Sequence, residues 1–205
     1  FSMSNMNWVT SLTALKVLSL PDNNVNGSIP DNIGSQLPFL FKLDLSGNKL
    51  SGAIPQSLGR DLTRLTRLDL SHNNLSGVIP HQLTRLSRLQ RIDLDRNMLS
   101  GSIPEGIGEL EFVKDMNLSS NALSGSMPRS LTKMLRLRYL SLAKNRLTGH
   151  IPDKFFALDN LIEVHLYENM LTGPVSEDIG SLRKLEHFLL HSNRLSGSIP
   201  VSITR

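Results

Sequence analysis

The chain has 205 residues, a formal net charge of +4 and no cysteine. The lack of cysteine excludes a disulfide framework and a thiol nucleophile. No run of 18 apolar residues occurs, so we expect no membrane-spanning helix and no membrane contact by this segment. Apolar residues make up 39% of the chain but aromatic residues only 5%, which indicates a core filled mainly by aliphatic side chains.

A unit of 24 or 25 residues repeats along the chain, and its clearest copy is LDLSHNNLSGVIP at residues 68–80. Close copies lie at residues 43–55, 92–104 and 140–152, and looser copies fill the remainder. One asparagine per copy marks the period: Asn23, Asn48, Asn73, Asn97, Asn121, Asn145, Asn169 and Asn193. A fixed period of this length indicates a solenoid of stacked repeats.

Each part of the unit predicts one local structure. Residues 68–70 alternate apolar, polar, apolar, which predicts a short strand whose leucines face the core. Asn73 lies where the chain turns inward, and we expect the eight asparagines to form a ladder bonded to the backbone of successive turns. Gly77 suits a bend or a close backbone contact, and Pro80 ends the extended segment. The leucine-rich return segment predicts a short helical turn.

The pattern L-x-x-L-x-L-x-x-N-x-L followed by S/T-G-x-I-P resembles the plant-specific subclass of leucine-rich repeats. This subclass occurs in plant receptor kinases, receptor-like proteins and polygalacturonase inhibitors. The resemblance implies an α/β repeat solenoid, a right-handed superhelix with a concave parallel β-sheet and a 3-10 or irregular convex side. We expect one domain over residues 1–205 with about eight repeats. Because the cysteine-containing caps of the subclass are missing, we expect a fragment that lacks both caps.

Two departures from the period predict local changes. The first two intervals between asparagines are 25 residues long because the return segment gains one residue, which predicts a small bulge on the convex side. In the seventh repeat, Pro174 interrupts the S/T-G-x-I-P segment, which predicts a change confined to the flank.

Exposed strand positions usually carry the function of a solenoid. In repeats six to eight these positions gather aromatic, imidazole and acidic groups, which are enriched at recognition surfaces. The predicted ligand-binding residues on the concave face are Tyr139, Glu163, His165, Tyr167, His187, Leu189 and His191. Ordinary drift of the repeat sequence is the alternative. Because histidine gains charge in mildly acidic fluid, we expect an acidic partner to bind more tightly as the pH falls.

A secondary polar strip lies in repeats two to four and consists of Lys42, Asp44, Arg67, Asp69, Arg91 and Asp93. It is either a self-neutralising array of salt bridges or a docking strip for a peptide. The histidines show no metal-ligand spacing, and no Ser/His/Asp set or carboxylate pair stands out from the repeat. We therefore predict no metal site, no cofactor and no enzymatic activity.

Acceptor tripeptides for N-glycosylation occur at Asn26, Asn74 and Asn117. We expect the first two beyond the strand and the third inside the concave face. Basic residues outnumber acidic ones between residues 81 and 146, which indicates a solvated convex face or a surface that attracts an acidic polysaccharide such as pectin. Nucleic acid is disfavoured as a partner because no aromatic residues are interleaved with the basic ones.

The resemblance implies an extracellular recognition module at the plant cell surface that binds a peptide, protein or glycan. A co-receptor, a cell-wall polysaccharide or a hydrolase are further partners that it implies. A secreted defence protein of the polygalacturonase-inhibitor type is one alternative. A structural, ice-binding or designed repeat protein is another, although the mixed outward columns do not suit a flat ice-binding surface.

Overall fold

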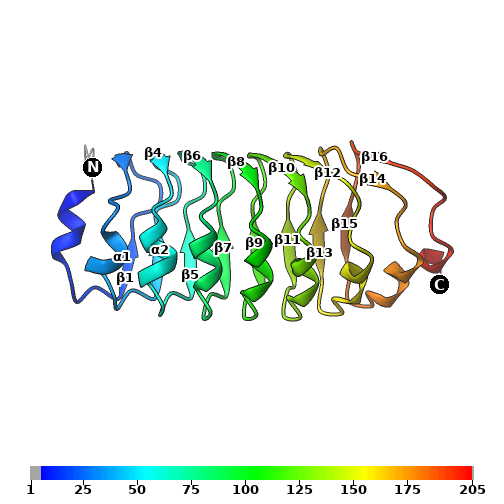
Figure 1. The fold of residues 1–205 in the computed structure, drawn as a ribbon, viewed down its shortest axis with the longest axis horizontal. Helices are drawn as coiled ribbons and strands as arrows, with labels where there is room; N and C mark the ends of the chain where they lie inside the picture. Colours follow the sequence, from blue (N-terminus) through cyan, green and yellow to red (C-terminus); the bar gives the residue numbers. More distant parts are fainter. Residues whose placement is uncertain (1–5, 205) are drawn as a thin grey trace.

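The computed structural model describes residues 6–204, which form one row of stacked repeats (Figure 1). Each repeat begins with a short strand, continues through a second extended segment and returns through one helical turn. The predicted α/β repeat solenoid is confirmed.

The first strands of the repeats pair into one parallel sheet of eight strands, in sequence order. They are β1 (Val17–Ser19), β3 (Lys42–Asp44), β5 (Arg67–Asp69), β7 (Arg91–Asp93), β9 (Asp115–Asn117), β11 (Tyr139–Ser141), β13 (Glu163–His165) and β15 (His187–Leu189). The strands pair without slip, so that Arg67 lies opposite Arg91 and Asp69 opposite Asp93. The first and third residues of each strand therefore form two columns on the outer face of this sheet, which we call the sheet face.

A second parallel sheet follows the asparagine of the repeats, where only an extended segment was predicted. Its six strands are β2 (Asn26–Ser28), β4 (Lys49–Ala53), β6 (Asn74–Val78), β8 (Met98–Ser102), β10 (Ala122–Ser126) and β12 (Arg146–Thr148). Pairing of these segments into a sheet was not predicted, because serine and glycine have low strand propensity. Stacking of identical backbones aligns these strands despite their composition.

Gly77 illustrates what this second sheet requires of its glycine. Its φ is +79°, in a backbone region that residues other than glycine rarely adopt. A Cβ at this position would lie 3.7 Å from the Cβ of Ala53, an ordinary contact. The backbone conformation therefore requires the glycine, and the predicted close contact is not the reason for it.

The second sheet breaks after β12, at the repeat that contains Pro174. Here β14 (Thr172–Gly173) pairs with β16 (Arg194–Leu195) in a separate sheet of two strands. Proline has no N–H to donate to a neighbouring strand. The Thr172 N–H still donates to the Gly149 carbonyl at 2.8 Å, so the repeats remain stacked and the change stays on the flank.

The return segments are single helical turns that lie in front of the strands in Figure 1. Those in the two 25-residue intervals are α-helical, α1 (Ile33–Gln36) and α2 (Gln56–Asp61). The other turns are 3-10 helices: η1 (Asn7–Ser11), η2 (His81–Arg85), η3 (Glu105–Glu109), η4 (Arg129–Lys133), η5 (Asp153–Ala157), η6 (Glu177–Ser181) and η7 (Val201–Thr204). Because an α-turn spans one residue more than a 3-10 turn, the predicted bulge is a change of helix type.

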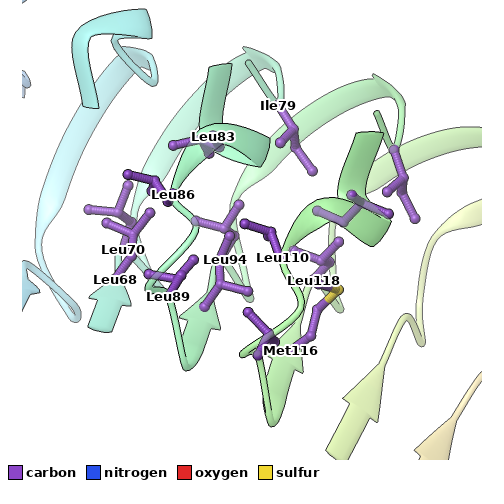
Figure 2. Close-up of a cluster of buried hydrophobic side chains, with 14 of the residues drawn as sticks. Leu68, Leu70, Ile79, Leu83, Leu86, Leu89, Leu94, Leu110, Met116 and Leu118 are labelled. Atoms are coloured by element: carbon purple, nitrogen blue, oxygen red, sulfur yellow. The ribbon is translucent and has the colours of Figure 1, made fainter. Parts of the chain in front are cut away.

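Leucines from strands and return segments fill the interior in layers (Figure 2). In the third repeat, Leu68 on β5 and Leu70 just after it point toward the return segment that carries Leu83 and Leu86, and all four are fully buried. Complete burial of one such side chain stabilises the fold by about 1.5–3 kcal/mol before the entropy cost of ordering. The core thus fixes the strand that presents the sheet face.

The repeated asparagines connect successive turns through a row of hydrogen bonds. Nδ2 of Asn73 donates to the carbonyl oxygens of Leu45, Leu70 and Ser71 at 2.9, 3.2 and 3.1 Å, and its Oδ1 accepts from the Leu50 N–H at 2.9 Å. The same pattern recurs at Asn48, Asn97, Asn121, Asn145, Asn169 and Asn193. The row is continuous but not uniformly buried, since Asn23, Asn97, Asn121 and Asn193 are only half-buried.

Candidate ligand-binding site

The sheet face is hollowed over β7 to β13, in repeats four to seven. The hollow has a volume of about 350 Å³, and the side chains of its outward columns are Arg91, Asp93, Asp115, Asn117, Tyr139, Ser141, Glu163 and His165. Ligand pockets usually measure about 300–1,000 Å³, so this space suits one or two side chains of a bound segment. It lies nearer the N-terminus than the predicted site in repeats six to eight.

The size of the β11 side chains explains the hollow. Ser141 is short, and the register places it between Asn117 on β9 and His165 on β13. Beyond the strand, Ala143 occupies the next position on this side, and its small side chain is fully buried. Tyr139 stands at the start of the same strand with 37% of its surface exposed. The repeat therefore presents an aromatic ring beside a gap.

Tyr139 stands between two carboxylates. The register places Asp115 of β9 and Glu163 of β13 beside it, one strand away on either side. Neighbouring strands are about 4.8 Å apart, so all three side chains can reach one bound group. Within residues 6–204, Asp115 has no ion pair, and Glu163 has only His165, with Nε2 3.6 Å from Oε2. The Arg138 guanidinium lies 5.7 Å from the centroid of the Tyr139 ring.

The side of the hollow formed by β7 carries less net charge than the part around Tyr139. Nη2 of Arg91 lies 3.4 Å from Oδ2 of Asp93. Burial raises the pKa of Asp93, and the charges of Asp69 and Asp95 add to this effect, whereas the Asp95 N–H and Arg91 oppose it. The lining thus holds one arginine against three carboxyl groups, in a chain that is basic overall. This balance favours a cationic group and not the acidic partner expected from the histidines.

The remaining residues of the predicted site lie next to the hollow. Tyr167 and His191 stack with ring centroids 4.7 Å apart and an interplanar angle of 14°, and His165 lies 6.1 Å from Tyr167. His187 and Leu189 occupy the exposed positions of β15, opposite Glu163 and His165. The seven predicted residues are therefore neighbours, but only Tyr139, Glu163 and His165 line the hollow.

The secondary polar strip is partly a salt-bridge array. Nζ of Lys42 lies 3.2 Å from Oδ2 of Asp44, and Arg91 pairs with Asp93. No ion pair joins Arg67 to Asp69 among the residues that the structure describes. Burial pushes the pKa of Asp44 up, but hydrogen bonds from Ser46 and Lys42 and the charge of Lys42 outweigh it and hold the pKa below its usual value.

The acidic residues of the strip also have a structural role that the sequence analysis missed. Oδ1 of Asp69 accepts from the backbone N–H of Ser71 at 3.2 Å and from its hydroxyl at 2.6 Å. Asp44 and Asp93 accept equivalent backbone bonds from the residue two positions ahead. Such bonds are typical of Asp and Asn where a strand ends in a turn.

The three glycosylation tripeptides lie in different surroundings. Asn117 sits in the hollow, where its Oδ1 accepts from the Ser119 N–H at 3.2 Å. Asn26 and Asn74 lie past the first sheet, as predicted, but within strands β2 and β6 of the second sheet. Asn74 is exposed and Asn26 is half-buried.

The turns that follow the helices carry basic and aromatic residues together. The guanidinium carbon of Arg64 lies 5.1 Å from the ring centroid of Phe39, and that of Arg136 lies 4.2 Å from the centroid of Phe112. The expectation that no aromatic residues accompany the basic ones was therefore wrong. The lack of aromatic residues near the basic ones therefore no longer argues against nucleic acid as a partner. That nucleic acid is not a partner stays a prediction.

Within the described part of the chain, no three His, Asp or Glu side chains converge as a metal site would require. None of the helices described there is long and apolar enough to cross a bilayer.

Comparisons with known proteins agree with the repeat geometry. The leucine-rich repeat family matches residues 52–99 and 136–195, and a second leucine-rich repeat pattern matches residues 14–36 and 39–60. Comparison with curated proteins gives no match.

Solved plant receptors are similar over nearly the whole chain. The ectodomain of the Arabidopsis receptor kinase HAESA, in complex with an extended IDA peptide hormone, has a TM-score of 0.90 and 36% identity over 95% of this chain and 33% of its own. The plant peptide hormone receptor RGFR1, in complex with RGF2, has a TM-score of 0.85 and 31% identity over 96% of this chain and 35% of its own.

A plant ice-binding protein is also similar, with a TM-score of 0.74 and 32% identity over 94% of this chain and 69% of its own. The chain spans about a third of the length of the receptor structures. With its regular sheet, its asparagine row and these matches, the chain belongs to the leucine-rich repeat family and resembles plant receptor ectodomains.

Proposed function

We propose that this chain is part of the extracellular ligand-binding region of a plant receptor and that its sheet face binds a peptide. The observation that carries this proposal is the hollow in which Tyr139 stands between the carboxylates of Asp115 and Glu163. The similar receptors HAESA and RGFR1 were solved with peptide hormones, which supports the same class of ligand here.

The side chains of the hollow suit an extended peptide with a basic group. A lysine, an arginine or a terminal amine above the Tyr139 ring gains a cation–π contact and two nearby carboxylates. Asn117 and Ser141 supply an amide and a hydroxyl that can bond a peptide backbone. Because these groups stand on paired strands, little side-chain freedom is lost on binding.

The alternatives have less support from the geometry. Ice binding calls for a flat column of like side chains, whereas one column here runs Arg67, Arg91, Asp115, Tyr139 and Glu163. No feature of the hollow specifically favours inhibition of a cell-wall hydrolase, because peptide binding accounts for each of its features. Binding of a co-receptor remains part of the proposal, since HAESA was also solved with the co-receptor SERK1.

Selection from a displayed random peptide library tests the proposal without a known ligand. The purified chain should enrich peptides that contain basic residues, and synthetic versions should bind it in solution. Y139A should weaken that binding by about 1–2 kcal/mol or more, as expected for a central aromatic contact. The double variant D115N/E163Q should remove the enrichment of basic residues.

Arg146 offers a matched control because it is exposed on β12, outside the sheet face. R146A should bind the selected peptides like the unchanged chain. Peptide binding is refuted if no peptide is enriched, or if Y139A and R146A bind equally while circular dichroism shows both to be folded.

A further inference from the structure

The turns between each helix and the next strand lie along the lower edge of Figure 1, and they carry a row of aromatic and basic residues. Each member is the second turn residue after a helix: Phe39, Arg64, Arg88, Phe112 and Arg136. The turns close through equivalent hydrogen bonds, such as Leu65 N–H to Leu62 carbonyl at 2.9 Å and Leu137 N–H to Met134 carbonyl at 2.9 Å. We call this set the turn row.

Two of the three arginines of the turn row lie over aromatic rings of the preceding repeat. Arg64 lies over Phe39 at 5.1 Å and Arg136 over Phe112 at 4.2 Å. Stacking uses the flat face of the guanidinium and leaves its N–H groups at the edge free. A stacked arginine is thus pre-ordered to bind an anion with two parallel hydrogen bonds.

In the part of the chain that the structure describes, the arginines of this edge have no carboxylate partner, although Glu111 and Asp159 lie in turns of the same edge. Within residues 6–204, none of Arg64, Arg88 and Arg136 forms an ion pair with a carboxylate, and neither do their edge neighbours Lys114 and Arg138. The phenylalanines remain partly open to solvent, with 43% of Phe39 and 42% of Phe112 exposed, and Phe41 beside them is 44% exposed. Within the described residues, the edge therefore presents basic groups without ion pairs beside open apolar patches.

We propose that the turn row binds a linear acidic polysaccharide whose sugars carry carboxylates, that is, a polyuronate. The positions of the row follow one another once per strand, about every 4.8 Å, with arginines at the second, third and fifth positions, which suits a linear polymer that carries many charges. Its carboxylates pair with the arginines, and the C–H faces of its rings lie on the exposed phenylalanine surface. This edge is separate from the sheet face, so the proposal does not depend on peptide binding.

Other polyanions fit the row less well. Anionic lipid surfaces call for apolar groups that protrude, whereas the Phe39 and Phe112 rings are each covered on one side by arginine. Single-stranded nucleic acid binds through bases stacked on open aromatic faces, and here those faces are shared with guanidinium groups. Lipid vesicles and single-stranded DNA therefore serve as competing probes.

The test uses the purified chain and an oligogalacturonate, with the same oligomer as its methyl ester, measured by calorimetry at two salt concentrations. Oligogalacturonate should bind with a salt-sensitive affinity, and the methyl ester should bind at least about tenfold more weakly because it lacks charge. The triple variant R64E/R88E/R136E should lose binding by at least a similar factor. F39A/F112A should weaken it while the net charge stays unchanged.

R129E/R146E/R194E is the matched control, since these arginines are exposed elsewhere and the change in charge is the same. It should retain most of the affinity, and thermal unfolding should show that every variant is folded. Equal losses in the two triple variants would refute the proposal, because net charge alone would then explain binding. Equal affinity for the ester, or tighter binding of DNA or anionic vesicles, would refute it as well.

Discussion

Replacement of Asn73 by alanine tests whether the asparagine row holds the repeats together. Asn73 is buried, with 7% of its surface exposed, and it bonds backbone groups of its own repeat and the preceding one. N73A removes the acceptor of the buried Leu50 N–H and the donor to three carbonyl oxygens.

The expected loss follows from what each backbone group retains. The Leu50 N–H loses its acceptor, and one orphaned buried group costs about 1–3 kcal/mol. The three carbonyl oxygens each keep a second donor, such as the Gly47 N–H that bonds the Ser71 carbonyl at 3.0 Å. Their weakened bonding adds about 1 kcal/mol. The free energy of unfolding should therefore fall by about 2–4 kcal/mol.

N23A is the control because Asn23, at the first repeat, bonds only the carbonyls of Leu20 and Pro21 within residues 6–204. The Leu20 carbonyl keeps a bond from Asn48 at 2.8 Å, so N23A should cost less than about 1 kcal/mol. Urea denaturation at neutral pH measures both losses, and a lower m-value in N73A would show that the repeats unfold in separate blocks. Equal decreases in the free energy of unfolding of N73A and N23A would refute the estimate, which rests on the number of buried hydrogen bonds that each asparagine makes.

G59A should destabilise the chain more than G77A, because a Cβ at Gly59 would lie 2.2 Å from the Gln82 carbonyl carbon while Gly77 has room. Urea denaturation should give about 1–2 kcal/mol for the positive φ at Gly77 and a larger loss for Gly59. D93N should become more stable relative to the unchanged chain as the pH rises. Burial raises the pKa of Asp93 above the usual 3.8, so the ionised carboxylate destabilises the fold at neutral pH. Thermal unfolding at about pH 3 and pH 7 checks this, and a pH-independent difference would contradict it. In protein secreted from plant cells, glycopeptide analysis should find glycan at the exposed Asn74 and none at Asn117; full occupancy at Asn117 would block the hollow.

Inward positions could be predicted from the sequence because burial restricts them to a few residue types. Every repeat has apolar residues at the positions of Leu68 and Leu70. Because the strands pair in constant register, the position of one strand sets the position of the next. The second sheet was missed because its order comes from contact between repeats and not from the propensities of serine and glycine. The residue before the asparagine was missed too. His72 and Arg96 have φ of 54° and 50°, and because different residue types occupy this position from repeat to repeat, no single type signals the conformation.

The hollow was predicted only in part because its shape depends on three strands together. Tyr139 was recognisable as an exposed aromatic residue, but the hollow also needs the short Ser141 and the longer side chains on both sides. The turn row was hidden for a related reason. Arg64 and Phe39 stack in space although a whole repeat separates them in the sequence, so a search for neighbouring aromatic and basic residues does not find them.

The second outward column is tied to the turns in the N-terminal half of the sheet face and not in the C-terminal half. In repeats two to five, Asp44, Asp69, Asp93 and Asn117 each accept a bond from the backbone N–H two residues ahead, which ties these positions to the turn. In repeats six to eight, Ser141, His165 and Leu189 take the same place, and within the described residues none of them accepts such a bond. Their side chains are therefore not needed to close the turn. Under the proposed function, a peptide would meet side chains tied to the turns at one end of the hollow and side chains without such bonds at the other, and Tyr139 stands where the two halves meet.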